Sequence, residues 1–216
     1  MCQTNILLQL SFRKMFDQIY QVCARVLRIG RRMAGLKKME GKRRQLGMYR
    51  LIGPDDPVED RLQDGYEYDE YNGALDEKWV SLINDSGDFT ALGIWTKETL
   101  HRTIIEQLIP GGAVLVTQDG ELIASTSICC SPQNPYSGVL MYVIVRHDHR
   151  GRGLGNAMTQ RAIRLCQRNG IKELGLLTDD YRLAAIKVYL RNGFLPMGQK
   201  SIESEDQWRK VFEQLK

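Results

Sequence analysis

The residues best suited to chemistry lie in a glycine-rich loop that follows an apolar segment. Residues 139–145 read VLMYVIV, and the next segment, RHDHRGRGLG, places Arg150 ahead of glycines at 151, 153 and 155. Glycines let a backbone approach a ligand closely, and successive outward-facing N–H groups form a concave anion site. A helical pattern over residues 156–169 would add the partial positive charge of a helix N-terminus. The pattern predicts a phosphate or pyrophosphate site, with the guanidinium groups of Arg150 and Arg152 close to the anion.

The spacing within this loop excludes the common nucleotide-binding patterns. A Walker loop requires GxxxxGK followed by Ser or Thr, which the chain lacks. The dinucleotide fingerprint GxGxxG or GxGxxA fails both from Gly151 and from Gly153. The spacing that fits is Arg-x-x-Gly-x-Gly, formed by Arg150, Gly153 and Gly155.

A second pattern lies downstream of a short apolar strand predicted over residues 173–177. The segment 178–194 has helical periodicity and carries Ala185, Tyr189 and the pair Gly193-Phe194 in the arrangement AxxxYxxxGF. With the loop, in this order, it resembles the GNAT N-acetyltransferase family, most clearly over residues 112–196. The resemblance implies a mixed α/β fold with a mostly antiparallel central sheet flanked by helices. The strand before the loop and the 173–177 strand would part at their ends, and coenzyme A would enter between them.

The resemblance also implies roles for individual residues. The loop amides would hold the pyrophosphate of acetyl-CoA, and a backbone N–H of the preceding strand would stabilise the tetrahedral oxyanion. Tyr189 corresponds to the family tyrosine that protonates the departing sulfur, a role suited to a phenol with a pKa near 10. The residues expected to contact acetyl-CoA are Val143, Ile144, Val145, Arg150, Gly151, Arg152, Gly153, Leu154, Gly155 and Asn156.

The chain departs from the family pattern at two places. Arg182 stands where many members carry an asparagine that contacts pantetheine. Residues 139–145 contain no carboxylate, whereas some members place a glutamate base on this strand. The base that deprotonates the acceptor is therefore left unassigned. The side chains considered for it are His147, His149, Tyr142 and Asp180, of which the histidine just before Arg150 is expected to be structural.

The remaining elements follow from periodicity and turn signals. The dipeptide Asp119-Gly120 between two alternating runs predicts a hairpin, and Pro110-Gly111-Gly112 is expected to end the helix before it. The predicted elements are a strand over 48–52, helices over 74–85 and 96–108, the hairpin over 113–130, and a final amphipathic helix over 204–216 that packs on the sheet.

An acidic, tyrosine-rich run over residues 55–77 admits two interpretations. Such a run is typical of a solvated loop or helix face. In the functional alternative, part of it borders the acceptor pocket, where carboxylates would favour a cationic amine.

Charge divides the chain near residue 48. Residues 1–50 carry twelve lysines and arginines against two acids, a net +10, and the other 18 bases and 24 acids give −6. We therefore expect a basic amphipathic helical extension over 1–47 and an acetyltransferase domain over 48–216. The extension is interpreted as a helix against the domain or a poorly ordered leader. The alternatives are a start assigned too early, a targeting peptide, or a surface for anionic lipid or nucleic acid.

The five cysteines form no CxxC pair and no metal-type spacing with the histidines. This predicts reduced thiols, a cytoplasmic location and no metal, and no apolar run reaches the ~18 residues of a membrane span. The leading hypothesis is an N-acetyltransferase that moves an acetyl group from acetyl-CoA to a primary amine of a small molecule by direct attack in a ternary complex. A different acyl donor or acceptor and a non-catalytic acyl-CoA-binding module remain as alternatives. No nucleic-acid partner is expected, and a homodimer stays open.

Overall fold

The structure, a computed structural model, describes residues 45–89, 93–131, 134–197 and 202–216. The basic extension predicted over residues 1–47 therefore lies outside the described residues up to residue 44. In chain order the elements are β1 (Gln45–Leu51), β2 (Glu67–Asp69), α2 (Asp76–Asp85), α3 (Lys97–Thr103), η2 (Ile105–Gln107), β3 (Leu108–Gln118), β4 (Glu121–Ser131), β5 (Asn134–Val145), η3 (His147–His149), α4 (Leu154–Arg168), β6 (Glu173–Asp179), α5 (Leu183–Arg191), β7 (Leu195–Pro196) and α6 (Ile202–Leu215).

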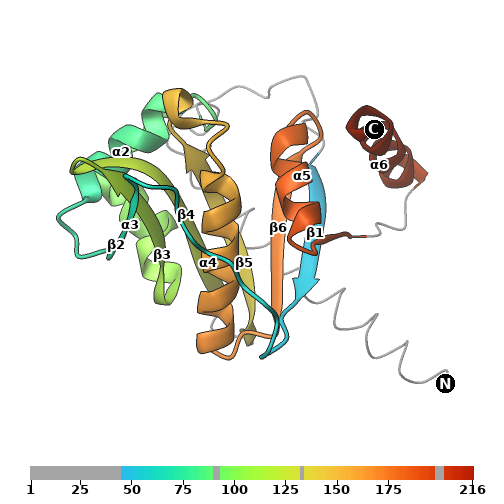
Figure 1. The fold of residues 1–216 in the computed structure, drawn as a ribbon, viewed down its shortest axis with the longest axis horizontal. Helices are drawn as coiled ribbons and strands as arrows, with labels where there is room; N and C mark the ends of the chain where they lie inside the picture. Colours follow the sequence, from blue (N-terminus) through green and yellow to red (C-terminus); the bar gives the residue numbers. More distant parts are fainter. Residues whose placement is uncertain (1–44, 90–92, 132–133, 198–201) are drawn as a thin grey trace.

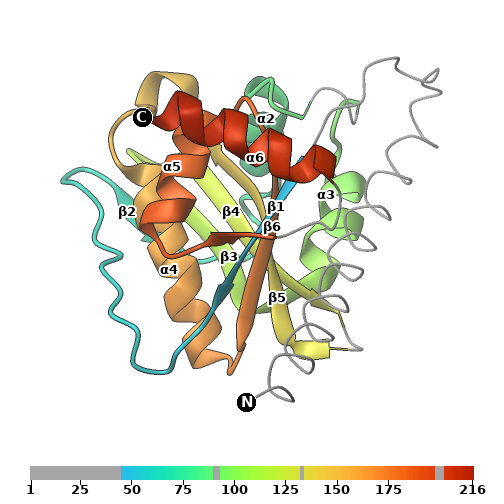
Figure 2. The same cartoon turned by 90° about the vertical axis from the view of Figure 1, so that its right-hand side faces the viewer.

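The strands of the described chain form one seven-stranded sheet in the order β2-β3-β4-β5-β6-β1-β7. Strands β5 and β6 run parallel and are joined through α4, whereas the other neighbouring pairs are antiparallel. Helices α4 and α5 cover one face of the sheet, and α2 and α3 cover the other (Figures 1 and 2). The predicted mixed sheet flanked by helices is therefore confirmed. No helix within the described ranges is long and apolar enough to cross a membrane.

Two apolar clusters hold the layers together. On the α4 and α5 face, strand residues such as Met48 and Leu174 pack with Ile163 of α4. On the other face, Trp79 of α2 and Leu100 of α3 pack on β3, β4 and β5. Burial of one such side chain contributes about 1.5–3 kcal/mol. The sequence predicted that the final helix packs on the sheet. In the structure, helix α6 contacts α5, and its residues Trp208 and Val211 belong to the first cluster.

The structure differs from the sequence prediction around β3. Thr96 caps α3 as predicted, accepting a hydrogen bond from the Thr99 amide at 3.3 Å. The helix ends at Thr103, however, so the prediction of a helix to residue 108 was wrong. Pro110, Gly111 and Gly112 lie inside β3, where the pairing with β4 shifts register between Leu108 and Ala113. A bulge of this kind accommodates proline and glycine within a strand.

The first part of the acidic run lies in an extended segment along the outer face of α4. We call this segment, residues 53–66, the strap. The Asp60 carboxylate pairs with Arg161 at 3.1 Å and with Arg164 at 3.0 Å. Gln167 donates to the carbonyl oxygens of Gly53 at 2.9 Å and Asp56 at 3.0 Å. Positions 161, 164 and 167 recur on one face of the helix, which explains why a single extended segment reaches all three. The strap then enters β2, which the sequence analysis had not predicted.

We predict that Gly112→Ala destabilises the protein. An added Cβ would lie 2.6 Å from the Ile128 carbonyl oxygen and 2.9 Å from that of Ile109, both main-chain atoms that cannot move independently. The expected loss is about 1–3 kcal/mol in the free energy of unfolding, measured by urea titration. Gly155→Ala is the control, because a Cβ there meets nothing within 4 Å. Equal unfolding midpoints for the two variants would contradict the prediction.

Candidate functional site

The candidate site begins where the parallel strands β5 and β6 separate. Strand β5 pairs with β6 only from Ser137 to Val139, opposite residues 173–175. Strand β6 nevertheless continues to Asp179 and stays paired with β1 over its whole length. Within the described chain, the last six residues of β5 therefore have no ladder partner on the side of β6. The predicted parting of these strands is present.

A bulge bends β5 away at this point. Tyr142 has a φ of +54°, and the pairing with β4 shifts register between Ser125 and Ser127. The Met141 carbonyl accepts hydrogen bonds from the hydroxyls of Thr126 at 2.9 Å and Ser127 at 3.3 Å. A positive φ is uncommon for a residue with a side chain, and such backbone strain often occurs at functional sites. The bulge keeps β5 on β4 while its end diverges from β6.

The predicted residues 143–145 follow the bulge directly. Ile144 is fully buried on the α2 side of the sheet, whereas Val143 and Val145 pack partly buried on the α4 side. The Val145 carbonyl accepts a hydrogen bond from Arg150 Nε at 3.1 Å. The side chains of these three residues are therefore occupied by packing.

The glycine loop has the predicted open geometry. Gly151 and Gly153 have φ values of +78° and +76°, a region in which a residue with a Cβ is strained. Gly153 caps α4, whose first internal bond runs from the Ala157 amide to the Gly153 carbonyl at 3.0 Å. The amides of residues 154–156 belong to the first turn and have no internal acceptor. A Cβ added at 151, 153 or 155 would meet nothing within 4 Å.

Two other loop residues are anchored through their side chains. Leu154 is buried beneath the start of α4, and the Asn156 amide oxygen accepts from Asn192 Nδ2 at 2.9 Å. Asn192 itself ends α5 and is 2% exposed. The loop is therefore tied to the C-terminal end of α5, on the other side of the parting.

The two arginines of the loop have different environments. Arg150 pairs with Asp88, in the segment after α2, at 3.2 Å, and its side chain is 44% exposed. Arg182 shares the same carboxylate at 3.5 Å and also pairs with Asp179 at 3.2 Å. Arg152 instead turns toward the strap and donates to the Tyr66 hydroxyl at 3.0 Å. The structure thus brings Arg150 and Arg182 to one carboxylate and directs Arg152 elsewhere.

His149 lies at the centre of a buried network behind the loop. Its Nε2 is 2.6 Å from Arg146 Nη2, and its Nδ1 is 2.7 Å from the Tyr66 hydroxyl. Because a guanidinium only donates, Nε2 must accept, and the neutral ring carries its proton on Nδ1. Burial and the charge of Arg146 lower the pKa of His149, against the opposing effect of Asp148. These contacts match the structural role expected for this histidine.

Tyr189 lies on α5 and is 6% exposed, with its ring 5.8 Å from that of Phe194. Burial raises the pKa of Tyr189 to about 12, and the charge of Arg182 acts in the opposite direction. Gly193, with a φ of +75°, ends the helix, and the Phe194 amide donates to the Tyr189 carbonyl at 3.0 Å. The AxxxYxxxGF pattern is thus a helix, its left-handed C-cap and the core residue behind it.

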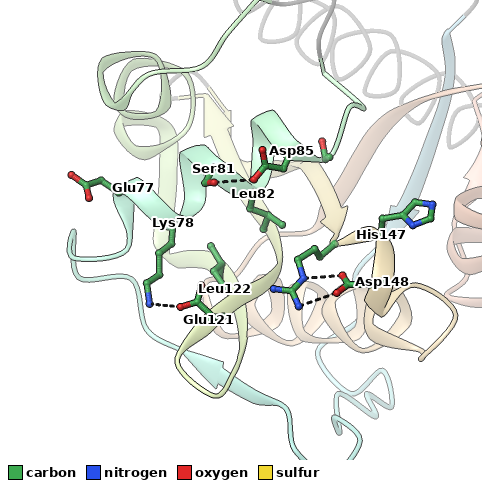
Figure 3. Close-up of a pocket in the computed structure, with 11 residues that line it drawn as sticks. Glu77, Lys78, Ser81, Leu82, Asp85, Glu121, Leu122, His147 and Asp148 are labelled. Atoms are coloured by element: carbon green, nitrogen blue, oxygen red, sulfur yellow. Dashed lines mark hydrogen bonds and ion pairs between the residues drawn. The ribbon is translucent and has the colours of Figure 1, made fainter.

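A separate pocket of about 450 Å³ lies between α2, the β3–β4 turn and η3 (Figure 3). Two ion pairs lie within its lining, Lys78 with Glu121 at 3.4 Å and Arg146 with Asp148 at 2.8 Å. His147 is exposed, and its ring points away from these pairs (Figure 3). None of residues 150–156 lines this pocket.

Sequence reasoning missed three of the residues that complete the site. They are Asp88, Tyr66 and, for its ion pairs, Arg182. Their contacts join segments that are far apart in the chain. No local pattern marks the first two. The replacement of the family's asparagine by an arginine was a signal that a carboxylate should lie nearby.

Comparison with known proteins identifies the family. The sequence model of the acetyltransferase (GNAT) family matches residues 75–194, so the chain belongs to that family. A mycothiol acetyltransferase of Acidothermus cellulolyticus is 30% identical over 141 residues, which cover 58% of this chain and 43% of that protein. N-acetyltransferase 8B of Rattus norvegicus is 27% identical over 93 residues, covering 41% of this chain and 42% of that protein. The chain thus spans less than half the length of these relatives.

Solved structures show the same fold. A GCN5-related N-acetyltransferase from Sphaerobacter thermophilus aligns with a TM-score of 0.60 at 19% identity, covering 71% of this chain and 48% of that chain. A tandem GNAT protein from the clavulanic acid biosynthesis pathway aligns with a TM-score of 0.55 at 16% identity, covering 70% and 50%. At these identities the likeness concerns the fold alone.

We predict that His149 makes the protein less stable in acid. Its pKa lies below 6.5 in the folded state and returns to that value on unfolding, so its contribution is present above pH 6.5 and lost as pH falls. Wild type should therefore lose more unfolding free energy than His149→Gln between about pH 7.5 and about pH 5.5. Urea titrations at both pH values test this. An equal loss in the two proteins would contradict it.

Proposed function

We propose that this chain transfers an acetyl group from acetyl-CoA to a primary amine of a small molecule, by direct attack within a ternary complex. The observation that carries the proposal is the open turn at the start of α4, where a Cβ added at Gly151, Gly153 or Gly155 would meet nothing within 4 Å, beside the parted strands. Family membership supports acetyl transfer as the reaction class. The names of the relatives are consistent with it, but they leave the acceptor undefined.

The donor would bind through the main chain of the loop. The diphosphate of acetyl-CoA would accept hydrogen bonds from the amides of residues 151–156, where the dipole of α4 also favours negative charge. Arg150, being 44% exposed and close to the loop, can add a charge-assisted contact. The space that a Cβ would occupy at residue 155 fits a ligand in close contact with the backbone.

The chemistry would take place between the parted strands. The amine nitrogen attacks the thioester carbonyl and loses a proton to water, an oxyanion forms, and the carbon–sulfur bond then breaks to leave the amide and the thiolate of coenzyme A. A main-chain N–H within residues 143–145 would stabilise the oxyanion. Tyr189 would give its proton to the thiolate. Burial raises the pKa of Tyr189 to about 12, so the phenol is protonated at neutral pH and has a proton to give, and the phenolate left behind regains its proton from water.

The acceptor would approach from the face opposite α4 and α5. Around the bulge on that face, the ring of Tyr142 packs edge-on against Phe89 at 5.0 Å and Trp95 at 5.1 Å. Of the strap carboxylates considered for amine selection, Asp60 pairs with Arg161 and Arg164 of α4, and Asp56 pairs with Arg50 of β1. We therefore propose that the region around Tyr142 determines which acceptor binds. The group that deprotonates the amine is not assigned.

Thiol release from acetyl-CoA in the presence of amines tests the proposal. A panel of amino acids, polyamines and aminoglycosides should contain at least one acceptor that accelerates release. Binding of acetyl-CoA without acceleration by any amine would favour the non-catalytic module instead. Faster release from another acyl-CoA would favour a different donor.

For Tyr189→Phe we expect kcat to fall about 100-fold, because the departing thiolate loses its general acid. The Kd for acetyl-CoA should not change, because the ring that packs on Phe194 remains. Steady-state kinetics and calorimetry measure the two quantities. An unchanged kcat would remove Tyr189 from the catalytic step.

Gly155→Ala should weaken acetyl-CoA binding without weakening the fold. A methyl group there meets nothing within 4 Å in the protein itself, but it would occupy the space proposed for the diphosphate. Overpacking of about 1–3 kcal/mol corresponds to a Kd about 5- to 150-fold higher. Calorimetry gives the Kd, and the urea midpoint serves as the control. An unchanged Kd would place the donor elsewhere.

A further inference from the structure

The sequence of the glycine loop, residues 150–155, does not by itself restrict the loop to one conformation. Arg152 stands between Gly151 and Gly153, both in left-handed conformation, and glycine loses more backbone freedom on ordering than any other residue. A loop free to sample other conformations would have to be ordered by the ligand, at a cost in affinity. Contacts that fix Arg152 also fix the two glycine turns beside it.

Tyr66, at the end of the strap, makes such contacts. Its hydroxyl accepts from Arg152 Nη1 at 3.0 Å and from His149 Nδ1 at 2.7 Å. Its ring meets the imidazole edge-on, with centroids 5.7 Å apart and planes at 81°. The residue is 8% exposed, so its hydrogen bonds are protected from water. Arg152 also donates to the Asp148 carbonyl at 3.2 Å, which closes the loop on itself.

The strap is itself fixed to α4 by its ion pairs and main-chain bonds. The Asp60 carboxylate holds Arg161 and Arg164, and the Glu59 amide donates to Gln160 Oε1 at 3.1 Å. Tyr66 therefore connects the strap, which is held on the middle of α4, to the loop before that helix. This connection can set the direction of the loop amides relative to the helix axis.

We propose that Tyr66 is a positioning residue that orders the glycine loop before the donor binds. The inference rests on the proposed function, since it assigns to Tyr66 the ordering of the site that would take the diphosphate of acetyl-CoA. It also gives Arg152 a role different from the predicted one. Its guanidinium holds the loop through Tyr66 and the Asp148 carbonyl, and Arg150 is left as the arginine next to the ligand.

Tyr66→Phe and Tyr68→Phe form a matched pair of variants. Tyr68 lies two residues further on, in β2, and its contacts are with the strap and α4: its hydroxyl donates to the Asp60 carbonyl at 2.8 Å, and the Arg161 guanidinium lies 4.9 Å from the centre of its ring. Both changes remove one hydroxyl and keep the ring. We expect Tyr66→Phe to raise the Kd and KM for acetyl-CoA about tenfold, as the loss of hydrogen bonds to charged and buried groups implies. Tyr68→Phe should leave both within twofold.

Two further measurements separate positioning from general loosening. S-acetylpantetheine carries the same thioester without the diphosphate, so its kcat/KM should be unchanged in Tyr66→Phe, as should kcat at saturating acetyl-CoA. Arg152→Gln should weaken acetyl-CoA binding to the same extent as Tyr66→Phe. The double variant should then bind no more weakly than either single one, because both changes break the same connection.

Three results would overturn the inference. They are a Kd for acetyl-CoA in Tyr66→Phe within twofold of wild type, an equal loss with S-acetylpantetheine, or additive losses in the double variant. Failure of the proposed function would be recognised separately. If the proposed function fails, proteins with Tyr66 intact already show it: wild type and Gly155→Ala would bind acetyl-CoA with the same Kd, or neither would bind it.

Discussion

Strand β6 does not stay paired with both β1 and β5 along its whole length, and the architecture of the site depends on this constraint. It is paired with β1 from Glu173 to Asp179 but with β5 at only three positions. Strand β5 remains on β4 because the Tyr142 bulge absorbs the change of direction and the Thr126 and Ser127 hydroxyls bond the displaced carbonyl. A main-chain group inside a protein needs a partner. On the proposed function, the edge of β5 beyond Val139 is where the polar groups of acetyl-CoA would meet the main chain.

The elements on either side of the parting are linked to each other at their ends. Asn192 at the end of α5 bonds Asn156 in the first turn of α4, and Gln160 bonds the same side chain at 2.6 Å. The strap fixes the outer face of α4, and the Tyr66–His149–Arg152 contacts fix the loop that precedes it. The strands can part without loss of order because the helices above them are held together. Preorganisation of this kind lowers the entropy cost of binding.

The sequence predicts well what is determined locally. Glycines at 151 and 153 are needed for their positive φ, and Gly193 is needed for the left-handed end of α5, so both patterns are visible without a structure. The order of the longer strands and helices also follows from periodicity, whereas the three-residue strand β2 was missed. The failure at 96–108 has a local cause too, because a proline and two glycines can end a helix or occupy a bulge, and only pairing with β4 selects the bulge.

Contacts between distant segments could not be predicted. Tyr66 and Arg152 are 86 residues apart, and Asp88 and Arg150 are 62 apart. The acidic run shows the same limit, because its composition indicates charge but does not reveal that α4 presents Arg161 and Arg164 to it. Composition therefore favoured a solvated segment and kept an acceptor pocket as the alternative, and neither interpretation includes the contacts with α4.

The ion pairs at the entrance bear on which groups would provide donor affinity. Asp88 already balances Arg150 on one side of the parting and Arg182 on the other. An ion pair as exposed as that of Arg150 is worth about 0–1 kcal/mol, so exchanging its carboxylate for a diphosphate oxygen changes the free energy little. The main-chain amides of the first turn of α4 have no acceptor within the helix, and a Cβ added at Gly155 would meet nothing within 4 Å. On the proposed function, the amides would therefore provide most of the affinity for the diphosphate, and Arg150 would contribute chiefly to its orientation.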